Sequence, residues 1–143
     1  MPQDAARAAL CAELAKFDFF SALSEAELGR VADAVSEQRT FEPGQVLVDQ
    51  GQVAMDCLLV VDGLAQVRRG NDPPVNMIGP GEPVGEIGAA EYSYRSARVV
   101  AETPVRAFVI PARRFRELLD ELPGVRTALD AKMSARLHQL RGD

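Results

Sequence analysis

The sequence has few of the residues that build metal centres, disulfide frameworks and histidine-based catalytic sites. His138 is the only histidine, which argues strongly against a multi-histidine metal site or a histidine-centred triad. The two cysteines, Cys11 and Cys57, are too few and too far apart to indicate a disulfide framework or a metal site. We therefore expect a reducing, cytoplasmic location and no metal.

Long apolar runs and an excess of positive charge are also missing. No apolar run approaches the roughly 20 residues that span a bilayer. Residues 1–17 contain acids and lack a basic head followed by an apolar block, so no secretion signal is expected. The formal net charge is −5, which argues against direct nucleic-acid binding. A small anionic ligand held by a few local arginines is not excluded.

Short β-rich runs separated by Pro and Gly turns dominate the chain after Ser36. Many short strands with closely spaced turns are typical of an all-β sandwich or barrel. Asp62-Gly63 is the best candidate for a hairpin turn, because it lies between two such runs. Arg68 and Arg69 precede the turn at Gly70, and we expect both to be solvated. The predicted strands are 39–41, 46–48, 57–61, 65–67, 75–78, 98–101 and 105–110.

Helical patterns flank this β-rich part. Ser24 and Glu27 form a predicted capping box ahead of apolar residues at helical spacing. Pro111 suits a helix start, and Pro123-Gly124 separates that helix from a last amphipathic helix over 125–140. The length of 143 residues suits one domain. We divide that single domain, 1–143, into N-terminal helices (1–35), a β-barrel (36–110) and C-terminal helices (111–141).

The stretch GEIGAAEYSYRSARVVA, residues 85–101, fits this plan poorly and suggests a binding site. A short helix that starts near Glu86 would present free backbone amides, which attract anions. Gly85 permits a close backbone approach or a positive φ. The planar guanidinium of Arg95 suits phosphate oxygens. Glu86 would repel an anion but would accept a hydrogen bond from a sugar hydroxyl, and phosphate beside ribose implies a nucleotide.

These residues resemble the cyclic nucleotide-binding domain family, of the catabolite activator protein and kinase regulatory subunit type. The phosphate-binding cassette of that family has the form Phe-Gly-Glu-Leu-Ala, a short helix, then Arg-Ala-Ala or Arg-Ser-Ala. Here the cassette is 84–97, with Val84-Gly85-Glu86-Ile87-Gly88 and Arg95-Ser96-Ala97. The resemblance covers about residues 17–140. It implies a mainly β fold: a double-stranded β-helix (jelly-roll) barrel with N-terminal helices and two C-terminal helices.

The resemblance also implies a role for each cassette residue. Arg95 would pair with the exocyclic phosphate oxygens, and Glu86 would accept from the ribose 2′-hydroxyl. The Ala97 amide would contact the phosphate, and the Ser96 hydroxyl would contact the base or the phosphate. The residues expected to line the ribose and phosphate with backbone are Gly85, Ile87 and Gly88.

The chain departs from the family pattern at several cassette positions. Val84 replaces an aromatic residue, and Ala89-Ala90 replaces a bulkier apolar pair. Tyr94 replaces the usual proline before Arg95. Arg98 takes a position that is usually neutral, where it either adds positive potential or points to solvent. These differences bear on affinity more than on ligand class.

The expected function is a cyclic nucleotide sensor that performs no chemistry on its ligand, cAMP or cGMP, and needs no other cofactor. It would pass binding to an unidentified effector protein through its C-terminal helices, with a homodimer possible and no direct nucleic-acid or membrane partner. One alternative is a ligand-free interaction or dimerisation module of the same fold. Another is a fragment of an activator-type transcription regulator, although no helix-turn-helix follows Asp143 in this sequence. An enzyme of this barrel type usually needs a histidine-rich metal site. A single histidine cannot build such a site, so we expect no enzymatic activity.

Overall fold

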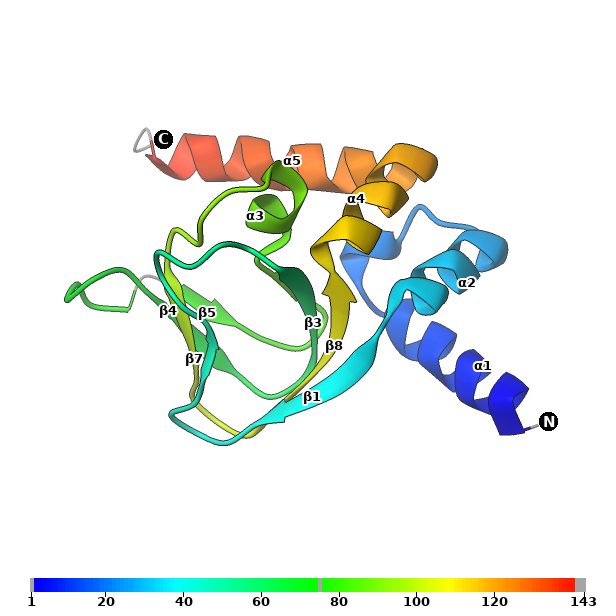
Figure 1. Ribbon diagram of the computed structural model, residues 1–143, viewed down its shortest axis with the longest axis horizontal. Coiled ribbons are helices and arrows are strands. Elements are labelled where there is room, and N and C mark those ends of the chain that lie inside the picture. The colour runs from blue at the N-terminus through cyan, green and yellow to red at the C-terminus, as the bar shows by residue number, and fades with distance from the viewer. Residues whose placement is uncertain (1, 75, 141–143) are drawn as a thin grey trace.

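The computed structural model describes residues 2–74 and 76–140. Its described helices and strands confirm a β-rich fold flanked by helices (Figure 1). The helices are α1 (Pro2–Leu14), the 3-10 helix η1 (Asp18–Phe20), α2 (Glu25–Ala34), α3 (Glu86–Glu91), α4 (Ala112–Glu121) and α5 (Pro123–Leu140). The strands are β1 (Glu37–Phe41), β2 (Val46–Val48), β3 (Asp56–Asp62), β4 (Ala65–Arg68), β5 (Asn76–Ile78), β6 (Pro83–Val84), β7 (Arg98–Ala101) and β8 (Val105–Pro111).

The strands form two antiparallel sheets. One 4-stranded sheet has the order β1-β8-β3-β6, and the other has the order β2-β7-β4-β5. All of the strand pairs that join neighbours within these sheets are antiparallel. The prediction of a mainly β fold with flanking helices is confirmed. Closure of the sheets into a jelly-roll barrel stays a prediction, because the two sheets share no strand within the described part of the chain.

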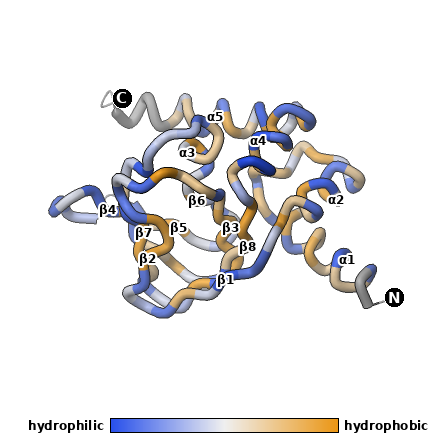
Figure 2. Tube along the Cα trace, in the orientation of Figure 1, coloured by the Kyte–Doolittle hydropathy of each residue, from blue (hydrophilic) through white to orange (hydrophobic). Residues whose placement is uncertain are grey.

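Strand β3 is buried on both faces, which explains its continuous apolar sequence. Successive side chains of a strand point to opposite faces. Leu58 and Val60 accordingly join the apolar cluster between the two sheets, whereas Cys57 and Leu59 join a second cluster beneath the helices. Figure 2 shows hydrophobic residues along β3 and β8 and a mainly hydrophilic β1 at the sheet edge. The central strands are therefore held by two cores at once.

The helices cover one outer face of the β1-β8-β3-β6 sheet and supply most of the second cluster. Its largest fully buried side chains include three phenylalanines. The N-terminal and C-terminal helices meet there, so the two ends of the chain contribute to a single core. Burying a large apolar side chain stabilises the fold by roughly 1.5–3 kcal/mol. The members with an exposed fraction of 2% or less include Leu14, Phe17, Phe20, Val31, Phe115, Val125 and Leu129.

The predicted capping box at the start of α2 is confirmed. The Glu27 amide donates to Ser24 Oγ at 3.2 Å, and the Ser24 amide donates to Glu27 Oε1 at 2.9 Å. Each bond satisfies a backbone donor that the first helical turn leaves without a partner.

We expect Ser24→Ala to lower the free energy of unfolding by about 1 kcal/mol, the usual effect of removing such a cap. Urea denaturation followed by circular dichroism would measure the change. Ser36→Ala is the control, because Ser36 lies outside the helices and its hydroxyl bonds only to the Val109 carbonyl. An equal loss in both variants would contradict a specific capping role for Ser24.

The prediction of a hairpin at Asp62-Gly63 is wrong. Strands β3 and β4 lie in different sheets, so the turn carries the chain from one sheet to the other. Gly63 has φ +96, and a Cβ at this position would lie 2.1 Å from the Pro104 carbonyl oxygen. The glycine is thus required by a close approach of two backbones, whereas sequence spacing alone suggested paired neighbours.

The two C-terminal helices are present, but the last one begins two residues before its predicted start and includes Pro123-Gly124. Helix α4 begins directly after Pro111, and α5 begins at Pro123. Val125 and Leu129 of α5 are buried, and Met133 packs against the same cluster from a partly buried position. Leu137 and Leu140 belong to the same predicted apolar stripe but lie outside the residues whose side chains are described. In Figure 1, α5 runs across the top of the molecule above α3.

None of the described helices combines the length and the apolar character that crossing a membrane requires.

Candidate functional site

The cassette begins where β6 ends and α3 starts. Gly85 is the residue before the first helical turn and has φ +75, a conformation that favours glycine. Helix α3 starts at Glu86, as the sequence predicts. The first amides of any helix lack partners within the helix. The start of α3 therefore offers backbone donors where the phosphate is predicted to bind.

Arg95 is buried against this helix start, with an exposed fraction of 7%. Its Nη1 donates to the Gly85 carbonyl at 3.0 Å. Its Nη2 donates to the Asp56 carbonyl at 2.7 Å and to Asp56 Oδ1 at 3.0 Å. Burial lowers the pKa of the Arg95 guanidinium, and the Asp56 carboxylate opposes that shift. The side chain is therefore a preorganised cation rather than a solvated surface charge.

Asp56 is a site residue that the sequence pattern did not reveal. Its Oδ1 accepts from Arg95, and its Oδ2 lies 3.7 Å from Nη1 of Arg39 on β1. Asp56 is the first residue of β3, so a hydrophobic strand places it beneath the cassette. An acid before an apolar run is too common to mark a partner for an arginine 39 residues away. Only the pairing of cassette and strand in space identifies it.

Backbone hydrogen bonds hold the end of the cassette against the segment before β3. The Arg95 amide donates to the Gln52 carbonyl at 2.7 Å, and the Ala54 amide donates to the Ser93 carbonyl at 3.0 Å. Val53 and Tyr94 form an isolated antiparallel bridge. This pairing positions the segment before Arg95, where the family usually has a proline. The replacement by Tyr94 therefore leaves Arg95 in place.

The residues that differ from the family pattern have defined positions. Ala89 is fully buried in α3, and Arg116 of α4 donates to its carbonyl at 2.9 Å. The Arg116 guanidinium also lies 3.4 Å from the centre of the exposed Tyr92 ring. These contacts attach α3 to α4 in spite of the small side chains. Arg98 is exposed and pairs with Asp49 at 2.8 Å, so it points away from the cassette.

A cavity of about 990 Å³ opens over the cassette. All seven predicted ligand-binding residues line it: Gly85, Glu86, Ile87, Gly88, Arg95, Ser96 and Ala97. Lys132, Met133 and Ala135 of α5 also border it, as do Val48, Val67, Arg69, Asn76, Ile78 and Val99 from the other sheet and its loops. The structure thus joins the cassette, one sheet and the last helix around one space. The sequence did not anticipate the contribution of Arg69 and Lys132.

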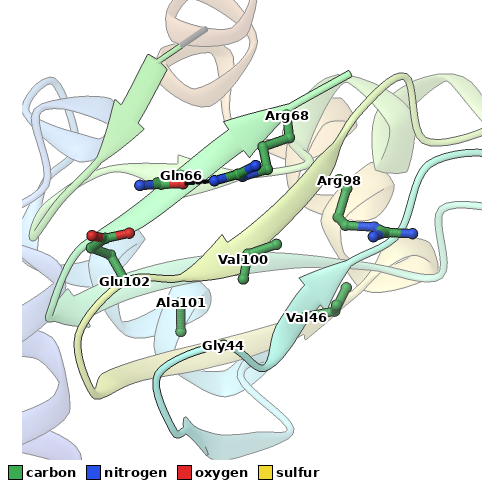
Figure 3. Close-up of a pocket in the computed structure, with 8 residues that line it drawn as sticks. All are labelled: Gly44, Val46, Gln66, Arg68, Arg98, Val100, Ala101 and Glu102. Carbon is green, nitrogen blue, oxygen red and sulfur yellow. Dashed lines mark hydrogen bonds between the residues drawn. The ribbon is translucent and has the colours of Figure 1, made fainter. Parts of the chain in front are cut away.

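A second, smaller hollow lies on the other face of the β2-β7-β4-β5 sheet and has a volume of about 420 Å³ (Figure 3). Its two arginines already have partners. Arg68 Nη2 donates to Gln66 Oε1 at 2.8 Å, and Arg98 pairs with Asp49. This hollow contains no part of the cassette, so the larger cavity is the candidate site.

Comparison with known families agrees with this geometry. Residues 38–121 match the model of the cyclic nucleotide-binding domain, which is more than half of the chain and includes the whole cassette. The chain belongs to the cyclic nucleotide-binding domain family. Its recognition from the cassette residues is therefore confirmed.

Several longer proteins are similar to this chain over most of its length. The Acetyltransferase Pat of Mycolicibacterium smegmatis is 35% identical over 117 residues, which cover 80% of this chain and 34% of that protein. The regulatory domain of Toxoplasma gondii PKA with cAMP has a TM-score of 0.81 at 23% identity, with 90% of this chain and 50% of that chain covered. The regulatory subunit of a cAMP-independent protein kinase A from Trypanosoma brucei has a TM-score of 0.81 at 27% identity, with 90% and 47% covered. This chain spans half or less of each of these relatives.

Proposed function

We propose that this cyclic nucleotide-binding domain is a sensor for cAMP or cGMP that binds its ligand without chemical conversion. The observation that carries the proposal is the position of Arg95. Its guanidinium is buried next to the start of α3 and within the cavity of about 990 Å³. A buried cation beside free helix amides favours a phosphate.

The cavity also accounts for the other parts of such a ligand. A cyclic phosphate would lie between Arg95 and the first turn of α3, where the Ala97 amide is a further donor. The ribose would lie along Gly85 and Gly88, within reach of the Glu86 carboxylate. The base would then extend toward the strands of the second sheet and α5. Each of these residues lines the cavity, which supports the proposed arrangement.

We propose that the C-terminal helices carry the response to a partner protein. Helix α5 borders the cavity through Lys132, Met133 and Ala135, and α4 is attached to α3 through Arg116. A ligand shifts a conformational equilibrium only through contacts that differ between two states. Contacts of α5 with the ligand would supply that difference.

The expected test result is a rise in melting temperature with a cyclic nucleotide. A ligand present at 100 times its dissociation constant stabilises the folded state by about 2.7 kcal/mol, which corresponds to roughly 5–15 °C for a domain of this size. Differential scanning fluorimetry with cAMP and with cGMP would measure the rise. The matched controls are 5′-AMP and 5′-GMP, which keep base and ribose but lack the cyclic phosphate.

The alternative is a ligand-free interaction module of the same fold. The Trypanosoma brucei relative is named as cAMP-independent, and in this chain Asp56 already neutralises Arg95. If none of the four nucleotides raised the melting temperature even at millimolar concentration, the sensor proposal would be wrong. The module would then be favoured, and analytical ultracentrifugation would test whether it is a dimer.

A further inference from the structure

Two consecutive arginines at the end of β4 lie on opposite faces of their sheet. Gln66 and Arg68 line the outer hollow (Figure 3). Ala65 and Val67 belong to the apolar cluster between the sheets. Because side chains alternate along a strand, Arg69 continues the inner row, and it lines the large cavity. The expectation that both arginines are solvated is therefore wrong for Arg69.

Arg69 has a hydrogen-bond donor that the protein does not satisfy. Its Nε is buried and lacks a hydrogen-bond partner within the described structure. Buried donors are almost always paired, and an unpaired one is unfavourable. Because this Nε is inaccessible, a ligand in the cavity would meet the terminal Nη groups of Arg69 instead. Arg69 is thus suited to bind an acceptor on whatever occupies this part of the cavity.

The part of the cavity next to Arg69 is the part left for the base. The cassette residues, including Gly85 and Arg95, occupy the end that suits phosphate and ribose. Arg69 and Asn76 border the cavity from the other sheet, with Val67 and Ile78 as apolar neighbours. Asn76 Oδ1 accepts from the Met77 amide at 2.9 Å, and the Asn76 side chain keeps both its NH2 donors and a second lone pair. Arg69, by contrast, offers donors alone.

We propose that Arg69 reads the base and makes the domain prefer cGMP to cAMP, an inference that rests on the proposed sensor function. Guanine presents two acceptors, O6 and N7, on one edge, and the arginine fork bonds to both. Adenine presents N7 beside the N6 amino group, which is a donor and faces the guanidinium unfavourably. Arg69, which can only donate, matches the guanine edge and mismatches the adenine edge.

Isothermal titration of the full chain with cGMP, cAMP and cIMP would test the assignment. Hypoxanthine keeps O6 and N7 but lacks the 2-amino group, so cIMP should bind like cGMP. The wild type should bind cGMP about 5- to 160-fold more tightly than cAMP, the range for a bidentate arginine–guanine pair. Arg69→Met should abolish this preference and leave cAMP affinity within about twofold. Arg68→Met is the matched control, since Arg68 lies on the outer face and its loss should change neither affinity.

The outcomes separate the base assignment from the sensor function. Equal affinities for cGMP and cAMP in the wild type, or a preference for cAMP, would overturn the role of Arg69. So would an equal loss of affinity for all three nucleotides in Arg69→Met, because Arg69 would then contact the phosphate or ribose. Binding of none of the three by the wild type would overturn the sensor function and this inference together. Melting temperatures without ligand would show whether each variant is folded.

Discussion

Replacement of Arg95 with glutamine should reduce the affinity for cAMP and for cGMP by at least about 100-fold. Hydrogen bonds to a charged group are each worth about 1.5–3 kcal/mol, and a guanidinium makes two with a phosphate. Glutamine removes the cation and one of these bonds. The loss should be equal for both nucleotides because they share the cyclic phosphate. Isothermal titration of wild type and variant would measure it.

Arg98→Gln is the matched control for this experiment. Arg98 lies three residues further along the chain, is exposed, and pairs with Asp49 on the outer face. Its replacement should leave nucleotide affinity within about twofold, because exposed ion pairs contribute little. Unchanged affinity in Arg95→Gln would show that the phosphate lies elsewhere. Arg95→Gln should also lower the unfolding free energy by about 1–3 kcal/mol, since the Gly85 carbonyl and Asp56 lose a buried donor.

Gly85→Ala should both weaken nucleotide binding and destabilise the fold. A Cβ on Gly85 would lie 2.1 Å from Arg95 Nη1 and 2.9 Å from its Cζ, so the guanidinium must move. The positive φ should lower the unfolding free energy by about 1–2 kcal/mol, and loss of the buried Arg95 hydrogen bonds should lower it by about 1–3 kcal/mol more. The displaced Arg95 no longer faces the phosphate, so affinity should fall at least about 10-fold, the loss of one charge-assisted bond.

Gly44→Ala separates backbone strain from displacement of Arg95. Gly44 has φ +90 and nothing within 4 Å of a built Cβ, and it lies outside the cassette. Gly44→Ala should lower the unfolding free energy only by the strain of the positive φ, about 1–2 kcal/mol, without any loss of affinity. Urea denaturation and titration of the two variants in parallel would provide the comparison. Equal affinity loss in both variants would contradict the role given to Gly85.

Local sequence patterns predicted most of the secondary structure. Strands β2 and β7 have the predicted bounds, because β-branched runs between turn residues are a local property. The capping box of Ser24 and the helix start after Pro111 are local as well. The short β6 was missed, since two residues carry no periodicity. The hairpin at Asp62-Gly63 was wrong because strand partners depend on the whole topology.

The candidate site likewise contains residues that local sequence predicted and residues that only the structure revealed. The spacing of Glu86 and Arg95 within one short segment identified the cassette, and all seven predicted residues line one cavity. Asp56 was not predicted, because its contact with Arg95 joins residues 39 positions apart. Arg69 was expected in solvent, because a turn beside Gly70 suggests exposure. Strand alternation assigns it to the inner face only once the position of the core is known.

The sequence by itself determined the family, most of the helices and strands and the position of the cassette, because each depends on neighbours within a few positions. Only the tertiary structure decided which acid pairs with Arg95. It also decided which of two adjacent arginines lines the cavity and which C-terminal helix borders it. These facts depend on segments brought together by two apolar cores. Hydrophobic burial is non-directional, so the amount of apolar sequence indicates that a core forms but does not specify which polar side chains meet at its edge.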